Sequence, residues 1–270
     1  MSASSHPDAA DFAGRTFLAV FAHPDDESIA CGGTLARLAD AGAHVVLMCA
    51  SRGEKGSVSD HALIADADLA TVRSRELDQA ARVLGIGEVM LYAHPDGDLR
   101  WADVPQFHVE IVLAIQNYRP DAVITFGEDG FYWHLDHIGV HERTYTAVKS
   151  FGPWAPPLYY VTMQHGVMTE LVQTSIANGL VLRANPFDIE PDAFGEHAKP
   201  PTLLVDVREW VPRKLAALRC HRTQIGPDNP FCHITDAQAR QLFGVEQFRL
   251  SPLEAGWQSA LERFGGHGAH

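Results

Sequence analysis

The sequence predicts an α/β fold: a single Rossmann-like, three-layer domain with a mostly parallel sheet and an irregular C-terminal third. Short apolar runs alternate with helix-like stretches between residues 16 and 161. The intervening helices are long enough to connect parallel strands by right-handed crossovers. The alternation weakens beyond Gln164, and residues 178–201 are rich in Pro, Asn and Asp, as in a long surface loop. No linker or repeat divides residues 1–270, so we expect one domain, with residues 1–14 and 265–270 flexible.

The predicted strands are short apolar runs bounded by polar residues, a pattern typical of strands that are buried on both faces. Five runs have this character: Thr16–Ala22, His44–Ala50, Val89–Tyr92, Ala122–Phe126 and Leu158–Val161. A sixth run, Leu203–Val207, is predicted to be an edge strand.

The predicted helices follow from capping residues and apolar spacing. Asp25 or Asp26 can cap a first helix that Gly42 stops, and Gly85 ends a second one whose apolar residues have helical spacing. The full set is Glu27–Asp40, Asp68–Leu84, Val104–Asn117, Leu135–Ser150, Trp210–His221 and Asp236–Phe243.

Composition excludes several classes of function. The chain has 21 Lys and Arg against 34 Asp and Glu, a net charge of −13, and no basic run, so nucleic acid and membranes are not expected partners. The N-terminal residues lack the basic and apolar regions of a secretory signal, which makes a cytoplasmic location the expectation. The four cysteines form no C-x-x-C pair, so neither a zinc ribbon nor a disulfide framework is indicated.

Two segments that follow predicted strands combine imidazole with carboxylate. The first is A-H-P-D-D-E at residues 22–27, and the second is Y-W-H-L-D-H at residues 132–137. In open α/β sheets, ligands bind at the carboxyl ends of the strands, which is where both segments fall. The three-residue spacing within each segment lets two side chains share one face of a turn. Two ligands from one turn and one from another would leave a position open for water, as in a catalytic zinc site.

Simpler interpretations exist for each segment taken alone. Residues 25–27 could be the acidic N-terminus of a helix, and His134 and His137 could be solvated helix residues. The chain could also be a doubly wound binding protein that carries out no chemistry. However, the turn after the first strand offers carboxylates where a phosphate binder needs the glycines of G-x-G-x-x-G. The two segments together favour a metal site.

These motifs resemble those of the PIG-L/LmbE-type zinc deacetylases. The resemblance includes AHPDDE at 22–27, H-x-D-H at 134–137 and S-R-G-E at 51–54. It extends to R-x-x-E-L at 73–77 and to K-x-x-A-L-x-x-H-x-T-Q at 214–224, and so touches most of residues 16–225. The family includes deacetylases of N-acetylglucosaminyl-inositol, of the bacillithiol pathway and of glycopeptide antibiotics. Residues 151–201 match no family pattern.

The resemblance implies a zinc site formed by His23, Asp26 and His137. Fe²⁺ suits such ligation almost as well. It further implies that Asp25 is the general base and that His134, steered by Asp136, is the electrophilic or acid partner. Hydrogen bonding to Asp136 is expected to raise the pKa of His134.

Tyr132 corresponds to a tyrosine thought to contact the substrate carbonyl, and Arg73 to an arginine that holds substrate hydroxyls or phosphate. Three acidic residues in loops near the expected site are further candidates for substrate contact: Glu54, Asp96 and Asp98.

Zinc polarises an amide carbonyl and activates water, and a nearby carboxylate can move the proton. The predicted function is therefore hydrolysis of an N-acyl group, acetyl above all, from an amino-sugar conjugate. An amidase that cuts larger amides, such as thiol conjugates, would share these residues and differ at the rim. The expected partner is a small-molecule substrate, and a homo-oligomer is possible.

Overall fold

The computed structural model describes residues 12–101, 104–182, 185, 187 and 189–267. Its strands are β1 (Thr16–Phe21), β2 (His44–Cys49), β3 (Glu88–Leu91), β4 (Ala122–Phe126), β5 (Leu158–Thr162), β6 (Leu203–Asp206), β7 (Val245–Leu250) and β8 (Gly265–His267). Its α-helices are α1 (Asp26–Asp40), α2 (Leu69–Leu84), α3 (Val104–Tyr118), α4 (Gly130–Trp133), α5 (Leu135–Lys149), α6 (Val167–Ala177), α7 (Val211–Leu218) and α8 (Asp236–Phe243).

The strands form one sheet in the order β3-β2-β1-β4-β5-β7-β6-β8. Strands β1 to β5 run parallel to one another, whereas β7 runs antiparallel to both β5 and β6. The predicted α/β fold with a mostly parallel sheet is confirmed. The predicted edge position of Leu203–Val207 is wrong, because β8 pairs with β6 on its outer side.

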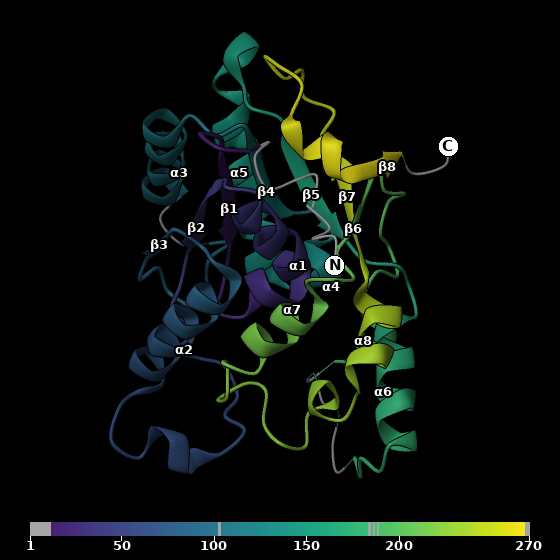
Figure 1. Ribbon diagram of the computed structural model, residues 1–270. Helices are drawn as coiled ribbons and strands as arrows, with labels where there is room; N and C mark the ends of the chain where they lie inside the picture. Colours follow the sequence, from purple (N-terminus) through teal and green to yellow (C-terminus); the bar gives the residue numbers. More distant parts are fainter. Residues whose placement is uncertain (1–11, 102–103, 183–184, 186, 188, 268–270) are drawn as a thin grey trace.

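Helices cover both faces of the sheet (Figure 1). Helices α1, α2 and α7 pack together on one face, and α3 and α5 pack together on the other. Strands β1 and β4 lie between these layers, and β4 is buried along its whole length. This double burial explains why both strands are nearly continuous apolar runs.

The strand order places a ligand site between β1 and β4. The chain moves outward from β1 to β2 and β3, then returns to the other side of β1 for β4. Connections that leave β1 and β4 therefore diverge to opposite faces, and a crevice opens at their carboxyl ends. The residues that follow Phe21 and Phe126 face this crevice.

The C-terminal third has more regular structure than predicted. Helix α6 and strands β7 and β8 were not expected, although V-E-Q-F-R-L of β7 alternates apolar and polar residues. Gly265–His267 pair with β6, and Phe12 is buried with its ring 4.5 Å from that of Phe264, so these parts of the predicted flexible ends make native contacts. Residues 1–11 and 268–270 lie outside the described residues. No helix in the described part of the chain is both long and apolar enough to cross a bilayer.

Candidate metal centre and active site

The turn after β1 is closed by its own carboxylate. Asp26 Oδ2 accepts hydrogen bonds from the backbone N–H of His23, at 2.7 Å, and of Ala22, at 3.2 Å. Asp25 adopts a φ of 118°, a conformation that L-residues with a side chain rarely take. The turn thus begins α1 at Asp26 and separates the side chains of the two adjacent aspartates.

The segment after β4 is equally constrained. Phe131 and Trp133 have φ values of 72° and 65°. Together with Asp25 they make three of the four positive-φ residues other than glycine in the described ranges. Such backbone strain gathers at functional sites, where the surrounding structure holds it in place. The strained segment ends at His134. His137 follows in the first turn of α5, and its ring stacks on that of Phe126 with 3.9 Å between the ring centroids.

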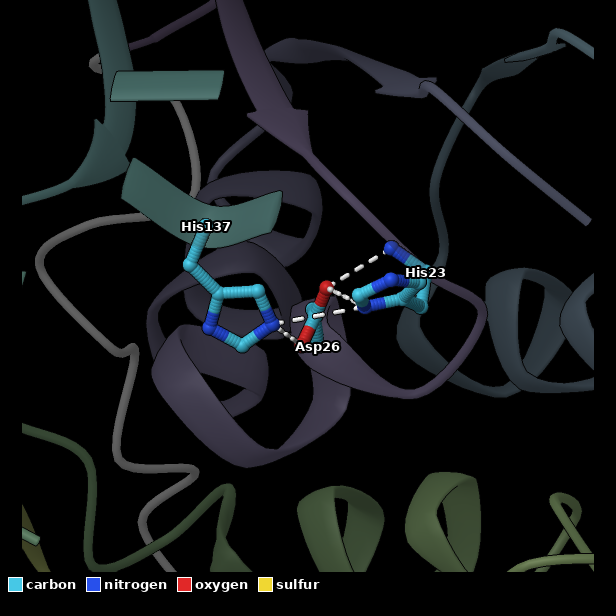
Figure 2. A group of neighbouring side chains, drawn as sticks. All are labelled: His23, Asp26 and His137. Carbon is cyan, nitrogen blue, oxygen red and sulfur yellow. Dashed lines mark hydrogen bonds and ion pairs between the residues drawn. The ribbon is translucent and has the colours of Figure 1, made fainter. Parts of the chain in front are cut away.

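Three side chains from these two segments converge (Figure 2). The Nε2 atom of His137 lies 3.2 Å from Asp26 Oδ1 and 3.3 Å from His23 Nδ1, which is itself 3.5 Å from Asp26 Oδ2. All three residues are buried, and one ligand atom of each lies within 4.8 Å of the others. The predicted ligands therefore surround a common point.

The second nitrogen of each imidazole is already engaged. His137 Nδ1 lies 3.1 Å from the carbonyl oxygen of Gly130, so it is placed to donate there and leaves Nε2 to face the cluster. His23 Nε2 lies 3.1 Å from both Asp136 Oδ2 and Asp96 Oδ1, which leaves Nδ1 for the cluster. Such outer contacts orient metal-binding histidines and raise their basicity. The donor set of two imidazoles and one carboxylate therefore fits a divalent metal ion.

The electrostatics of the cluster favour a cation. Burial alone would lower the pKa of His23, but contacts with Asp136, Asp26 and Asp96 raise it well above its usual value. Burial would raise the pKa of Asp26, but His137 and His23 hold it well below its usual value. The carboxylates around this point stabilise a positive charge on His23, and a metal ion would satisfy the same negative charge.

Asp25 is not one of the three converging ligands, and its carboxylate contacts Arg73. Its Oδ2 lies 3.2 Å from Arg73 Nη2, and that guanidinium also donates to the carbonyl oxygens of Pro24 and Gly53. Burial raises the pKa of Asp25 to about 6, against the opposing effect of Arg73. A carboxylate with this pKa next to a metal site is suited to accept a proton near neutral pH.

Behind Asp25 lies a buried pair that sequence reasoning did not assign. Glu27 Oε2 accepts from the Asp25 backbone N–H at 3.0 Å, and Glu27 Oε1 lies 3.0 Å from His221 Nε2. The pair holds the backbone of Asp25 in its unusual conformation. An acidic residue at a helix start normally faces solvent, and no local pattern indicates that Glu27 contacts His221, which is 194 positions away.

The contact between Asp136 and His134 differs from the one predicted. The Asp136 carboxylate contacts His23 and accepts from the backbone N–H of Gly97 and Leu99, while its own backbone N–H donates to His134 Nδ1 at 3.2 Å. Burial and the neighbouring His137 and His23 lower the pKa of His134 to about 4. Asp136 acts to raise this pKa, as expected, but burial and the two neighbouring histidines outweigh the carboxylate, so the net shift is downward. With a pKa of about 4, His134 is expected to be neutral at pH 7, and because its Nδ1 accepts from the backbone, its hydrogen is expected on Nε2.

The other predicted site residues divide into two groups. Arg73, Tyr132 and Asp96 line a cavity of about 480 Å³ that also contains His23, Asp26 and His134. Glu54 and Asp98 are exposed and do not line it. The Glu54 carboxylate accepts from the Asp96 backbone N–H, and Asp98 pairs with Lys55 at 2.8 Å. These two acidic residues shape the loop beside the cavity.

Comparisons with known proteins identify the family of the chain. The model of the PIG-L family, described as GlcNAc-PI de-N-acetylase, matches residues 18–148. A 1D-myo-inositol 2-acetamido-2-deoxy-alpha-D-glucopyranoside deacetylase from Acidothermus cellulolyticus is 34% identical over 258 residues, covering 87% of this chain and 88% of the relative. The chain belongs to the PIG-L family.

Two solved structures share the PIG-L fold of this chain. The N,N'-diacetylchitobiose deacetylase from Pyrococcus horikoshii has a TM-score of 0.60 at 22% identity, covering 88% of this chain and 84% of its own. The 4-carboxy-2-hydroxymuconate hydratase from Pseudomonas putida KT2440 has a TM-score of 0.62 at 19% identity, covering 91% of this chain and 100% of its own. One fold therefore carries both chemistries, and the fold alone does not determine the reaction.

Proposed function

We propose that this PIG-L protein is a zinc-dependent hydrolase that removes the N-acyl group from an N-acylated amino-sugar conjugate. The observation that carries the proposal is the convergence of His23, Asp26 and His137 at a cavity where Asp25 stands beside them. The relatives that match most of the chain are named as deacetylases of an acetamido sugar linked to inositol. A small polar conjugate of this kind is the proposed substrate, and a cytoplasmic location remains a prediction.

The residues of the chain divide the work of amide hydrolysis. When bound, the metal ion would supply a Lewis acid that polarises the amide carbonyl and makes water more acidic. The Asp25 carboxylate accepts the proton of the attacking water and returns it to the departing amine nitrogen. Arg73 holds Asp25 in position at 3.2 Å while it does so.

His134 serves the opposite side of the reacting carbon. Because its Nδ1 accepts from the Asp136 backbone N–H, its Nε2–H is free to donate to the oxygen on which negative charge develops. One such donor contributes roughly 2.7–4 kcal/mol to transition-state stabilisation. Tyr132 lines the cavity, and its ring centroid lies 5.7 Å from that of His134. We assign Tyr132 to contact with the same oxygen.

The test is release of acetate from a panel of N-acetylglucosamine conjugates, including the inositol-linked sugar, by protein loaded with zinc. We expect acetate and free amine in equal amounts, loss of activity with a chelator, and recovery when zinc is restored. The same assay with Fe²⁺ identifies the metal that supports the higher turnover. Absence of amide cleavage on every conjugate would contradict the proposal.

A second candidate is an amidase that cuts larger amides, such as thiol conjugates, with the same residues. The cavity of about 480 Å³ has both polar and apolar lining residues and is large enough for such an amide as well as for an acetylated sugar. Cysteinyl amides in the same panel separate the two activities. Binding of sugar without cleavage would instead indicate the non-catalytic protein.

A further inference from the structure

The cavity at the metal centre has two chemically different walls. One wall is polar and contains Lys55, Gly56, Ser57, Asp96, Gly97 and Gln224. The other, called here the apolar wall, contains Tyr132, Phe187, Ile189, Phe194, Ile225 and Phe231. Three of the apolar residues belong to residues 178–201, the stretch that is irregular in sequence, and two follow α7.

The apolar wall starts at the metal-binding residue His137. The ring of Tyr132 lies 5.1 Å from that of His137 and 4.6 Å from that of Phe194. From Phe194 the contacts continue to Phe187 at 5.7 Å, and from Phe187 to Phe231 at 6.2 Å. The apolar surface is therefore continuous with the reaction centre.

The polar wall starts at the other metal-binding histidine. Asp96 Oδ1 lies 3.1 Å from His23 Nε2, and Asp96 Oδ2 accepts from the Lys55 backbone N–H at 2.7 Å. On the same wall, Gln224 donates to the carbonyl oxygen of Ser57 at 2.8 Å. The polar wall thus begins at His23 and the apolar wall at His137.

An amide held at this centre has two substituents, the acyl chain on its carbonyl carbon and the sugar on its nitrogen. They extend from the amide in different directions. The sugar on the nitrogen side carries hydroxyls that need hydrogen-bond partners when they leave water, and the polar wall offers them. We propose that the substrate's acyl group is an aliphatic chain longer than acetyl and that it lies along the apolar wall. This inference rests on the proposed amide hydrolysis and specifies the substrate class.

The apolar wall is poorly suited to stacking on a sugar ring. Phe194 and Phe231 are 4% and 1% exposed, so neither offers a ring face to the cavity. The half-buried residues of the wall are Tyr132, which we assign to the carbonyl oxygen, and Phe187, Ile189 and Ile225, of which two are aliphatic. An acetyl methyl group would leave most of this surface in contact with water, whereas a chain of four to six carbons would cover it.

The experiment uses glucosamine N-acylated with acetyl, butyryl or hexanoyl, so that the amine is constant. Glucosamine release by the zinc-loaded protein gives kcat/KM, and calorimetry with the Asp25→Asn variant gives the affinity for each amide without turnover. We expect both quantities to rise by about two- to fourfold per methylene, the factor for burial of a CH₂ group. A profile that is flat or falls from acetyl to hexanoyl would overturn the inference while leaving deacetylation intact.

Variants place the chain on the apolar wall. Ile189→Ser and Ile225→Ser are each expected to lower the hexanoyl-to-acetyl ratio by about threefold or more, because a polar group replaces apolar surface. Ile176→Ser is the matched control, since Ile176 is 48% exposed on α6 and does not line the cavity. Equal ratios in all three variants would reject the assigned wall. If the affinity rises with acyl-chain length but no glucosamine is released, the result would contradict the proposed hydrolysis and support the apolar wall as a binding site for the acyl chain.

Discussion

The polar metal centre and the apolar wall of the same cavity are built in different ways. The metal centre comes from two short segments that follow β1 and β4, and backbone hydrogen bonds or stacked rings fix its ligands. The apolar wall comes from residues 187–194 and 225–231, where the sole regular elements in the described part are the short 3₁₀ turns Pro191–Ala193 and Pro230–Cys232. Its side chains are held by contacts among rings, which adapt more readily than hydrogen bonds.

This difference indicates how reaction and specificity are separated in the molecule. In the proposed function, the reaction depends on atoms at the ends of central strands, where the position of each residue is fixed by the sheet. The proposed specificity depends on a loop that can change sequence without disturbing the sheet. Substitutions at the metal centre should therefore change the reaction itself.

The largest effect is expected from Asp25→Asn. The amide cannot accept the proton, so turnover should fall by roughly 10²–10⁴-fold, the usual contribution of general-base catalysis. Metal content should be unchanged, because Asp25 contacts Arg73 and is not one of the three converging ligands. Steady-state kinetics and elemental analysis of the purified variant check both points. Asp78→Asn, an exposed position on α2, is the matched control. Wild-type turnover in Asp25→Asn would remove the base from the mechanism.

His134→Ala should have the next largest effect. Loss of one oxyanion donor costs about 10²–10³-fold in kcat, and the metal should remain, since His23, Asp26 and His137 are untouched. Because His134 also caps α5 through its Nδ1, thermal melting should accompany the kinetics. His134→Asn keeps a side chain that can cap the helix and isolates the catalytic part. Metal loss in both variants would make His134 a ligand.

Asp136→Asn and Asp96→Asn should weaken metal binding without abolishing it. Each carboxylate contacts His23 Nε2, and loss of such an outer partner typically lowers metal affinity by about 10–100-fold. Competition with a coloured chelator measures the dissociation constant. If Asp96 instead contacts the sugar alone, Asp96→Asn will raise KM and leave the metal affinity at the wild-type value.

The dependence of kcat on pH should show a decline on the acidic side and no decline between pH 6 and 8. Asp25 acts as a base when it is deprotonated, and burial raises its pKa to about 6 before metal binds. A bound cation lowers that pKa, so activity should decline as pH falls below 6, by about tenfold per pH unit beneath the final value. Burial lowers the pKa of His134 to about 4, so its neutral form donates throughout this range. A requirement for imidazolium would instead make activity fall between pH 6 and 8.

The features that could be predicted from the sequence are those in which the residue types of a short segment reflect its place in the fold. The central strands are apolar because both faces are covered, and His23, Asp26 and His137 follow strands that end at one edge. Each of these features is visible within a few residues of the chain.

The remaining features depend on contacts between distant positions. Burial of Glu27 by His221, the orientation of Asp136 toward His23 and the depressed pKa of His134 all arise from packing that no spacing encodes. Glu54 and Asp98 were predicted to contact the substrate. In the structure, the Glu54 carboxylate accepts from the Asp96 backbone N–H and Asp98 pairs with Lys55, contacts that the sequence does not reveal. Phe187 and Phe194 lie in a stretch without periodicity, so nothing marked them as parts of the cavity.

The most direct test of the account is metal stoichiometry in the wild-type protein and in two adjacent variants. We expect one ion per chain in the wild type and in Asp25→Asn, and a large loss in Asp26→Asn, where a neutral amide replaces the carboxylate ligand. Metal-loaded protein of each kind, dialysed together and measured by plasma mass spectrometry, gives the comparison. Full metal content in Asp26→Asn, or equal loss from both variants, would contradict the assignment of one aspartate to the metal and its neighbour to the proton.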